Sequence, residues 1–370
     1  MDTTYQATVL TGAGGVERLE VRALPLPEPS TGEIRVRIRA CGVGSTDVGM
    51  MRRGSYPFAP KVPFVPGYDI VGDVEAVGDE VDSLAIGQRV AALTIHGGFG
   101  EVVVRTADQF IPVPEGLDDS EAVALVLNYV SAFQMIERIA KPEKGQTALV
   151  TGANGGVGTA LLELLRLRGV TVFGAASESK RALVESYGAR FVASRGGSLD
   201  AAVRKIVPGG VDCAFDAIGG PCAAECVRAT KRGGKVVGYG WMGTSRHGRP
   251  STALVLRTIW TLLAGSVLAG RHGTLYGITG LYHSDPRPFR QDLSTLFGML
   301  ERGEIHPLIA ARLPLLEARQ GIAMLEAGGI EGKIVLAAAL TSEATSMLGV
   351  WDRSRTGDFE KAFPRSGGLS

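Results

Sequence analysis

Residues 149–158 read LVTGANGGVG, and this stretch joins an apolar strand to a helix expected over Gly158–Arg168. Gly155 allows the backbone to come close to a pyrophosphate, and Gly158 allows the helix to pack tightly on the strand. The first turn of a helix offers unpaired N–H groups and the positive end of a dipole, which together bind anions. The stretch therefore predicts a dinucleotide site whose phosphates contact six consecutive residues: Ala153, Asn154, Gly155, Gly156, Val157 and Gly158.

Strand and helix units surround this glycine turn. The expected elements are strands at 148–151, 170–175, 212–216 and 235–238, and a second helix at 178–187. Repeated strand–helix–strand units of this length are typical of a doubly wound parallel sheet. The glycine pattern alone is weak, because Ala153 takes the position of its first glycine, so this context supplies the support. The alternative is a glycine-rich turn that serves only packing.

The end of the second strand indicates which nicotinamide cofactor fits. An acidic residue there would accept hydrogen bonds from a ribose hydroxyl and repel a 2′-phosphate. The chain instead has small and hydroxylic residues up to Ser177, followed by Lys180 and Arg181. A hydroxyl donor and a charge-assisted hydrogen bond from Lys180 suit a phosphate, which favours NADPH over NADH. Glu178 argues the other way, and in the alternative interpretation Ser177 caps the helix while both cations are solvated.

The first third of the chain has strands without helices between them. Ile34–Ala40 alternates apolar and basic residues, as a half-buried strand does, and glycine or proline separates the later strands at 69–77, 88–93 and 100–104. Helical periodicity then runs over 118–139. This spacing predicts an antiparallel, barrel-like domain before the parallel sheet.

The expected domain organisation follows from these changes in pattern. The chain is of the α/β class, and its last strand, 332–336, is expected to return to the first domain. The polar residues after Leu340 show no periodicity and predict a flexible tail. The predicted segments are 1–127 for the first part of the barrel domain, 128–280 for the dinucleotide-binding domain, 281–340 for the return and 341–370 for the tail.

Composition restricts the partners and the location. Over 370 residues, 39 Lys and Arg oppose 38 Asp and Glu, so a net charge of +1 gives little long-range attraction for nucleic acid or anionic lipid. A small-molecule substrate is expected instead. The four cysteines are scattered, which indicates a reducing compartment. The first residues lack a basic region followed by an apolar core, so no secretory signal is expected and the predicted location is the cytoplasm.

One apolar stretch, Ala253–Ala269, is interrupted by Arg257 and a few hydroxyl residues. A bilayer-spanning helix needs about 20 apolar residues, and a central Arg costs roughly 2.5 to 3.5 kcal/mol. We therefore expect no transmembrane segment but a buried or partner-facing helix. Docking of this helix at a membrane surface stays open as an alternative.

Eight phrases within residues 5–338 together resemble the medium-chain dehydrogenase/reductase superfamily. They are Cys41-Gly-Val-Gly44-Ser-Thr-Asp47, Val65-Pro-Gly67-Tyr68-Asp69, Gly87-Gln-Arg-Val90, Gly98-Phe-Gly100-Glu101, the glycine turn, Phe215-Asp216-Ala-Ile-Gly219-Gly220, Gly233-Gly234-Lys-Val-Val-Gly238 and Gly332-Lys333-Ile-Val-Leu336. The resemblance implies a GroES-like, mainly antiparallel β-barrel catalytic domain and a Rossmann-like domain. It also implies a homodimer, which members of the superfamily often form.

The residues at the metal positions of this superfamily point to one of its branches. Zinc alcohol dehydrogenases place a cysteine where this chain has Gly44, and a His-Glu pair where it has Tyr68-Asp69. Catalytic zinc needs about three nitrogen or sulfur ligands plus an open position, and glycine with tyrosine offers neither, so no metal is expected here. Cys41 lies near the Gly44 position without partners and is predicted to be a buried structural thiol. What remains is similar to the zinc-independent quinone oxidoreductase branch, and Asn128–Phe133 is similar to the vesicle amine transport protein homologues within it.

The resemblance also implies residues that contact the cofactor. Tyr129 and Ser131 would lie against the nicotinamide, and Ser177 and Lys180 would receive the 2′-phosphate of NADPH. Many relatives have a tyrosine at the Ser194 position, and Arg195 could replace its contact with that phosphate. The remaining cofactor contacts expected from the resemblance are Thr46, Gly240 and Lys333.

Without a metal, the substrate has to be activated already. A quinone or an α,β-unsaturated carbonyl spreads the charge that arrives with a hydride, whereas a simple alcohol or aldehyde does not. Tyr56 is the best predicted proton donor or oxyanion partner, by its similarity to a tyrosine of enoyl-thioester reductases, and Tyr68 is the second. Either tyrosine could instead only line the pocket. His96 is a weaker candidate for a substrate contact, and the basic residues Arg246, His247 and Arg249 read as a solvated loop.

The sequence thus predicts an NADPH-dependent, zinc-independent reductase that transfers hydride to a quinone or an α,β-unsaturated carbonyl. Two alternatives stay open. One is an enoyl-thioester or biosynthetic double-bond reductase. The other is an NADPH-binding protein of low turnover that acts by association.

Overall fold

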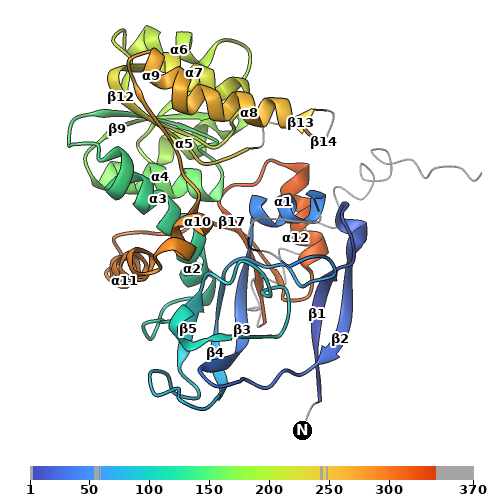
Figure 1. The fold of residues 1–370 in the computed structure, drawn as a ribbon. Coiled ribbons are helices and arrows are strands. Elements are labelled where there is room, and N and C mark those ends of the chain that lie inside the picture. Colours follow the sequence, from blue (N-terminus) through green and yellow to red (C-terminus); the bar gives the residue numbers. More distant parts are fainter. Residues whose placement is uncertain (1–2, 54–57, 59, 242–244, 247–248, 339–370) are drawn as a thin grey trace, which may run out of the picture.

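Two β-sheets, each the centre of one domain, organise the chain (Figure 1). The computed structural model describes residues 3–53, 58, 60–241, 245–246 and 249–338. A parallel sheet forms the upper domain in Figure 1, and a mostly antiparallel sheet forms the lower one. The predicted fold class, a Rossmann-like domain combined with a GroES-like domain, is confirmed. The predicted domain boundaries stay predictions, and the predicted tail at 341–370 lies outside the described residues.

The upper sheet has six strands, all paired in parallel, in the order β10-β9-β8-β11-β12-β15. The strands are β8 (Thr147–Thr151), β9 (Thr171–Ala176), β10 (Arg190–Ala193), β11 (Val211–Asp216), β12 (Thr230–Gly238) and β15 (His272–Leu275). The strand order reverses between β8 and β11. In an open parallel sheet, ligands bind outside the carboxyl ends of the strands at this switch point.

Helices cover both faces of this sheet, as doubly wound folds require (Figure 1). α4 buries Leu161, Leu162 and Leu165 on one face, and residues of α6 and α7 form a second apolar core on the other. The helices are α4 (Gly156–Leu167), η5 (Glu178–Lys180), α5 (Arg181–Ser186), α6 (Leu199–Ile206) and α7 (Pro221–Ala229). α4 begins at Gly156, two residues earlier than the predicted start at Gly158, and its N-cap is Gly155.

The lower sheet joins strands from both ends of the chain, in the order β16-β17-β3-β4-β5-β7 with β6 also paired to β3. Its strands are β3 (Glu33–Val43), β4 (Ile70–Val77), β5 (Arg89–Ala92), β6 (Val102–Thr106), β7 (Ile111–Pro112), β16 (Ile309–Pro314) and β17 (Lys333–Ala337). β17 pairs antiparallel with β3. The predicted return of the last strand to the first domain is therefore present.

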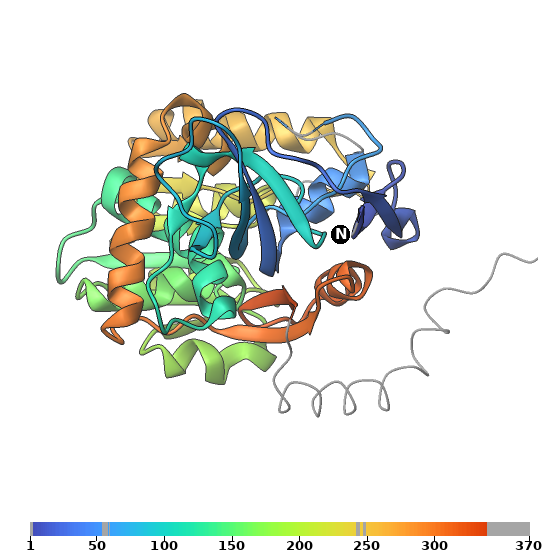
Figure 2. The ribbon, with the colours of Figure 1, turned by 90° about the horizontal axis from the view of Figure 1, so that it is seen from below.

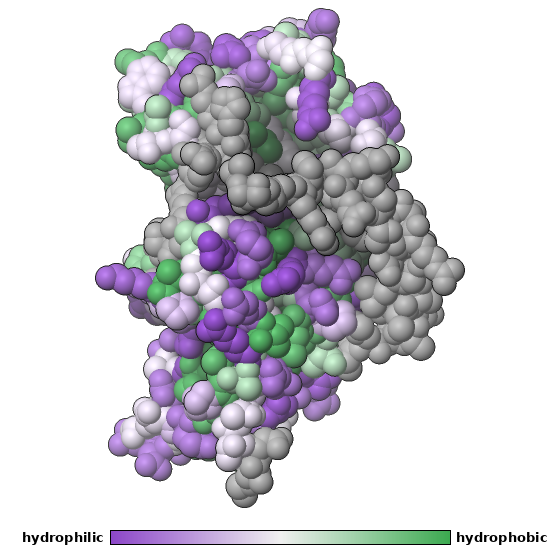
Figure 3. All heavy atoms as spheres, turned by 90° about the vertical axis from the view of Figure 1, so that its right-hand side faces the viewer, coloured by the Kyte–Doolittle hydropathy of each residue, from purple (hydrophilic) through white to green (hydrophobic). Residues whose placement is uncertain are grey.

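Smaller elements complete the lower domain. β1 (Thr4–Leu10) and β2 (Leu19–Pro25) form an antiparallel pair, and α1 (Ser45–Arg53) and α12 (Ala318–Ala327) flank the sheet. Two short 3₁₀ turns occur at η1 (Val16–Arg18) and η2 (Ala107–Gln109). Seen from the side of β1 and β2, the described surface mixes hydrophilic and hydrophobic residues, as protein surfaces ordinarily do (Figure 3).

A long helix connects the two domains. It consists of α2 (Asp119–Ala124), η3 (Leu125–Tyr129), α3 (Val130–Gln134) and η4 (Met135–Ala140), where η3 and η4 are π-helical turns. Asp118 caps its start by accepting hydrogen bonds from the amides of Ser120 and Glu121, as its residue type favours. By length and composition this one described helix could cross a membrane, but 78% of its apolar window is buried inside the protein.

The apolar stretch 253–269 forms a helix with one buried and one exposed face. It consists of α8 (Thr252–Trp260), η7 (Thr261–Gly265) and α9 (Ser266–Leu268). Thr258, Leu262 and Ser266 are buried, whereas four apolar side chains on the other face are 43–66% exposed: Leu256, Trp260, Leu263 and Val267. Their spacing of three or four residues places them along one line, which we call the apolar stripe.

The remaining described elements are β13 (Ser245–Arg246), β14 (Arg249–Pro250), α10 (Ile278–Ser284) and α11 (Arg287–Glu301). α11 runs along the side of the molecule opposite β1 and β2 (Figure 2). His247, part of the predicted basic loop, lies outside the described residues.

Candidate active site

The glycine turn is a tightly packed junction between β8 and α4. A Cβ atom at Gly158 would overlap the Gly152 carbonyl oxygen, and one at Gly156 would overlap the Asn128 side chain. A Cβ at Gly155 would meet only the Gly152 oxygen, at 3.5 Å. No side chain caps the first turn of α4. The backbone here therefore has the form that an anion site at a helix N-terminus requires.

The end of β9 carries the residues predicted to recognise a 2′-phosphate. The Ser177 hydroxyl lies 3.2 Å from that of Ser179, and the Lys180 ammonium lies 2.9 Å from a Glu331 carboxylate oxygen. Lys180 also donates to the Gly329 carbonyl at 2.7 Å. The alternative interpretation, in which Lys180 is simply solvated, is thus wrong for this side chain.

The neighbouring cations differ in how they are paired. Arg181 contacts Glu178 at 2.7 Å and Glu185 at 3.4 Å, as an exposed helix residue commonly does. Arg195 is exposed, and within the described residues no carboxylate lies within 4 Å of it. Its predicted contact with the phosphate stays a prediction.

Tyr129 and Ser131 lie on the connecting helix beside α4. Both are buried, and the Tyr129 hydroxyl donates to a Glu163 carboxylate oxygen at 2.5 Å. Burial and the nearby Glu163 carboxylate raise the pKa of Tyr129, so it stays protonated at neutral pH. This hydrogen bond fixes the tyrosine against α4, and the predicted contact of both residues with a nicotinamide stays a prediction.

The loop after β3 is organised by Asp47. Its carboxylate accepts hydrogen bonds from the amides of Gly44, at 2.9 Å, and Gly67, at 3.2 Å. Burial raises the pKa of Asp47 to about 7. The Thr46 hydroxyl beside it is buried and has no hydrogen-bond partner within the part of the chain that the structure describes. Because an unsatisfied buried hydroxyl is costly, Thr46 is suited to meet a polar atom of a ligand.

Of the two predicted catalytic tyrosines, only Tyr68 is described, since Tyr56 lies outside the described residues. Tyr68 is buried, and its hydroxyl shares a hydrogen bond with that of Thr279 at the start of α10. The contact joins the loop before β4 to a segment more than 200 residues later. Tyr68 therefore lies where the two domains meet, and its catalytic role stays a prediction.

A buried ion pair links Asp69 to Lys333. The ammonium lies 2.8 Å from one carboxylate oxygen, and the two side chains are 0% and 3% exposed. Burial raises the pKa of Asp69, and the Lys333 charge opposes that rise. Gly42 makes room for the pair, because a Cβ there would overlap the Lys333 side chain. The ammonium of Lys333 thus has an acidic partner, and its predicted cofactor contact stays a prediction.

Sequence reasoning missed Tyr239, which follows β12. Its hydroxyl is buried and finds no hydrogen-bond partner among the residues that the structure describes, and burial raises its pKa. A hydroxyl aromatic residue at the carboxyl end of a central parallel strand is a signal that the sequence offered. The next residue, Gly240, was predicted as a cofactor contact, and here it allows close packing, because a Cβ there would overlap the Ala217 carbonyl.

Of the four cysteines, Cys41, Cys213 and Cys226 are buried and Cys222 is half-buried. Cys41 is fully buried and its pKa is raised by burial, which fits the predicted structural thiol. Cys222, Cys226 and Asp216 lie close together. Each has one atom that could bind a metal ion, a thiol sulfur or a carboxylate oxygen, and these three atoms lie within 4.8 Å of one another. Asp216 already accepts hydrogen bonds from Thr151 and the amides of Ile218 and Gly219. This carboxylate therefore holds the loop after β11.

A surface cavity of about 210 Å³ lies between the connecting helix and α10–α11. It is mostly apolar, and its described lining includes Gln134, Tyr276 and Tyr282 but none of the predicted site residues. The predicted site residues that the structure describes therefore lie outside this cavity.

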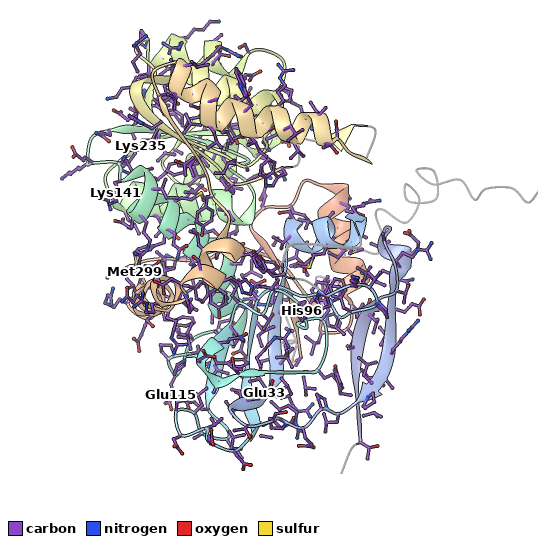
Figure 4. All side chains as sticks on the ribbon, viewed as in Figure 1. Glu33, His96, Glu115, Lys141, Lys235 and Met299 are labelled. Carbon is purple, nitrogen blue, oxygen red and sulfur yellow. The ribbon has the colours of Figure 1, made fainter. Side chains whose placement is uncertain are left out.

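His96 lies in the lower, GroES-like domain (Figure 4). Its Nδ1 atom lies 3.0 Å from the Arg105 guanidinium, which also donates to the His96 carbonyl at 2.7 Å. Burial and the Arg105 charge lower the pKa of His96 to about 4. The ring is therefore neutral at physiological pH, with Nδ1 accepting from Arg105.

The unfolded chain binds a proton at His96 near pH 6.5, whereas the folded chain does so only near 4, so the folded state loses stability as the pH falls between these values. Glutamine does not titrate in this range. We therefore expect the free energy of unfolding of His96→Gln to fall by about 1 to 2 kcal/mol less than that of wild type between pH 7.5 and 4.5, a difference reduced because His96 is only half-buried. Urea unfolding of both proteins at pH 7.5 and 4.5 measures the difference. Parallel pH dependence of the two proteins would contradict the assigned pKa.

Comparison with known proteins identifies the family. The synaptic vesicle membrane protein VAT-1 homolog of Mus musculus is 31% identical over 342 residues, which cover 89% of this chain and 82% of that protein. The quinone oxidoreductase of Rattus norvegicus is 28% identical over 329 residues, covering 87% and 94%. This chain belongs to the VAT-1 and quinone oxidoreductase branch of the medium-chain dehydrogenase/reductase superfamily. The predicted resemblance is confirmed.

Family descriptions and solved structures agree with membership of the medium-chain dehydrogenase/reductase superfamily. The "Alcohol dehydrogenase GroES-like domain" matches residues 30–115, and the "Zinc-binding dehydrogenase" family matches residues 156–279. The crystal structure of the human synaptic vesicle membrane protein VAT-1 homolog-like protein superimposes with a TM-score of 0.78 at 27% identity, covering 92% of this chain and all of that one. The chain is therefore a member of an oxidoreductase family.

Proposed function

We propose that this protein is an NADPH-dependent, zinc-independent reductase that transfers hydride to a quinone or an α,β-unsaturated carbonyl. The observation that carries the proposal is the uncapped N-terminus of α4 at the glycine turn, with Lys180 at the end of the next strand. A dinucleotide with a 2′-phosphate suits this pair of features. The quinone oxidoreductase relative supports the substrate class.

The described residues fit a bound dinucleotide. The backbone from Ala153 to Gly158 would hold the pyrophosphate, and Ser177 and Lys180 would hold the 2′-phosphate. The buried hydroxyls of Thr46 and Tyr239 have no hydrogen-bond partner among the described residues, so a ligand would satisfy them. When bound, the cofactor supplies a hydride; the protein orients it and excludes water.

The residues at the metal positions support a reaction without zinc. Gly44 has no side chain to ligate a metal, and the Tyr68 hydroxyl is engaged with Thr279. Asp69, which follows Tyr68, is held by Lys333. The electrophile must therefore carry its own activation, as a conjugated carbonyl does. A hydrogen bond from Tyr56 or Tyr68 to the carbonyl oxygen would stabilise the enolate that forms.

A turnover panel tests the proposal. The purified protein is mixed with NADPH or NADH and with a quinone, an enone, an enoyl thioester, or an aldehyde, and absorbance at about 340 nm follows oxidation of the nicotinamide. We expect the quinone and enone to be reduced with NADPH and the aldehyde to be inert. If the enoyl thioester is reduced faster than the quinone and the enone, the protein is an enoyl-thioester reductase instead. Tight NADPH binding without any turnover would favour a binding protein.

Tyr68→Phe removes the hydroxyl that would contact the substrate oxygen but leaves the ring in place. Loss of one hydrogen-bond donor to a developing charge lowers kcat by about 100- to 1000-fold when the donor is catalytic. We expect this loss with the quinone or enone, with NADPH affinity unchanged. The control is Tyr5→Phe, at a partly buried tyrosine in β1. Equal activity of Tyr68→Phe and wild type would remove Tyr68 from the mechanism.

We further propose that the protein is cytoplasmic and homodimeric, with the apolar stripe covered by a second copy. Exposed apolar surface of this kind marks interaction sites, and β15, which contacts η7, is at the edge of the parallel sheet.

Light scattering is expected to give twice the 38.8 kDa chain mass. Trp260→Glu combined with Val267→Glu should give monomers, whereas Ile86→Glu, at an exposed residue elsewhere, should not. A monomeric wild type that co-floats with vesicles would instead support docking at a membrane.

A further inference from the structure

A short segment of the catalytic domain crosses to the dinucleotide domain and lies on the glycine turn. We call residues 328–333, which run from the end of α12 to the first residue of β17, the strap. The Gly332 amide donates to the Asn154 carbonyl at 2.9 Å, and the Asn154 side chain donates to the Ile330 carbonyl at 2.8 Å. Gly332 also forms an isolated parallel β-bridge with Gly155. The strap therefore contacts the residues proposed to hold the pyrophosphate.

Residues of the strap also contact Lys180, the cation proposed to bind the 2′-phosphate. Glu331 places a carboxylate oxygen 2.9 Å from the Lys180 ammonium, and the Gly329 carbonyl accepts from the same ammonium at 2.7 Å. The Lys180 side chain is 16% exposed and that of Glu331 is 41% exposed. Two groups from one domain thus fill two of the three donor positions of a lysine from the other.

Other nearby cations do not offer the same site. Arg181 is paired with Glu178 and Glu185 and packs over the Phe191 ring at 4.2 Å. Of the two cations in residues 177–181, Lys180 pairs with Glu331 of the strap, whereas Arg181 pairs with acidic residues of its own domain. A phosphate on Lys180 would lie a few ångströms from the Glu331 carboxylate, and like charges at that distance repel.

We propose that Glu331 determines cofactor specificity by competing with the adenosine 2′-phosphate for Lys180. NADPH has to displace Glu331 from the ammonium, whereas NADH, which has no phosphate there, does not. The pair also holds the strap on the dinucleotide domain in the absence of cofactor. This inference rests on the proposed NADPH site and identifies the residue that sets its selectivity.

The geometry of the strap allows this exchange. Gly328, Gly329 and Gly332 have φ values of +77°, +77° and +85°, which favour glycine, so the segment turns sharply at both ends. The bonds between the strap and Asn154 do not involve the Glu331 side chain. Glu331 can therefore leave Lys180 while the rest of the strap keeps its contacts.

The test compares Glu331→Gln with Glu326→Gln in the full chain. Glu326 lies five residues earlier and pairs with Arg52 at 2.6 Å, so its variant removes the same charge without touching Lys180. Calorimetry measures binding of NADPH, NADH, 2′,5′-ADP and 5′-AMP. We expect Glu331→Gln to tighten NADPH and 2′,5′-ADP about tenfold and to change NADH and 5′-AMP less than twofold. The tenfold gain equals about 1.4 kcal/mol and should shrink at high salt.

Two further measurements separate the inference from the proposed function. In a Lys180→Met background, Glu331→Gln should no longer tighten NADPH. Without any ligand, hydrogen exchange of residues 328–333 should be faster in Glu331→Gln than in wild type and unchanged in Glu326→Gln. If wild type binds NADPH but Glu331→Gln tightens NADPH and NADH equally, or neither, the inference is wrong. If no dinucleotide binds to any variant, the proposed function is wrong and the specificity role falls with it.

Discussion

Replacing Lys333 by methionine is expected to lower the free energy of unfolding by about 3 to 5 kcal/mol, the usual cost of removing one partner from a buried ion pair. The reason is that Asp69, at 0% exposure, would keep a buried charge with no cation beside it. Urea unfolding at pH 7.5 measures the effect. Because loss of Lys333 raises the pKa of Asp69 further, the folded variant takes up a proton, and the difference from wild type should decrease as the pH falls towards 5.

Two controls define this result. Arg52→Met breaks the exposed pair with Glu326 and should cost no more than about 1 kcal/mol. Combining Lys333→Met with Asp69→Leu removes both charges and should recover part of the stability, since an apolar pair needs no desolvation. If the double variant is as unstable as the sum of its single variants, packing rather than charge explains the loss.

Gly158→Ala is expected to lower NADPH affinity at least tenfold and to cost about 1 to 3 kcal/mol of stability, the range for overpacking a tight site. The added methyl would overlap the Gly152 carbonyl and lie 2.9 Å from the Ala153 backbone, and neither backbone group can move without distorting the turn. Alanine is otherwise favoured over glycine in a helix by up to about 1 kcal/mol, so a loss of stability shows that the overlap dominates. Calorimetric titration with NADPH and urea unfolding measure the two effects.

Gly209→Ala is the matched control. A Cβ at Gly209 has no atom within 4 Å, so this variant should keep NADPH affinity and change stability by no more than about 0.5 kcal/mol. If Gly158→Ala behaves like Gly209→Ala, the glycine turn does not need glycine at this position. In that case the proposed pyrophosphate site would lose its main support.

The repeated strand–helix–strand pattern and the glycines at 152–158 were enough to predict the parallel sheet and the start of α4 to within two residues. These features depend on neighbours in the chain. The periodicity that indicates a strand or a helix is read from residues close together in the chain. The family followed from motifs spread over residues 5–338, because each motif is local.

The sequence by itself also determined that position 44 offers no metal ligand and that Lys180 and Ser177 follow β9. It did not determine what Lys180 contacts. Its partner Glu331 is 151 positions later, and Asp69 and Lys333 are 264 apart. Only the tertiary structure brings these charges together, because strand β17 returns to β3 and carries the strap across the domain seam. Side chains this far apart in the chain meet only because of the way the fold connects its strands, and a local sequence pattern does not predict that connection.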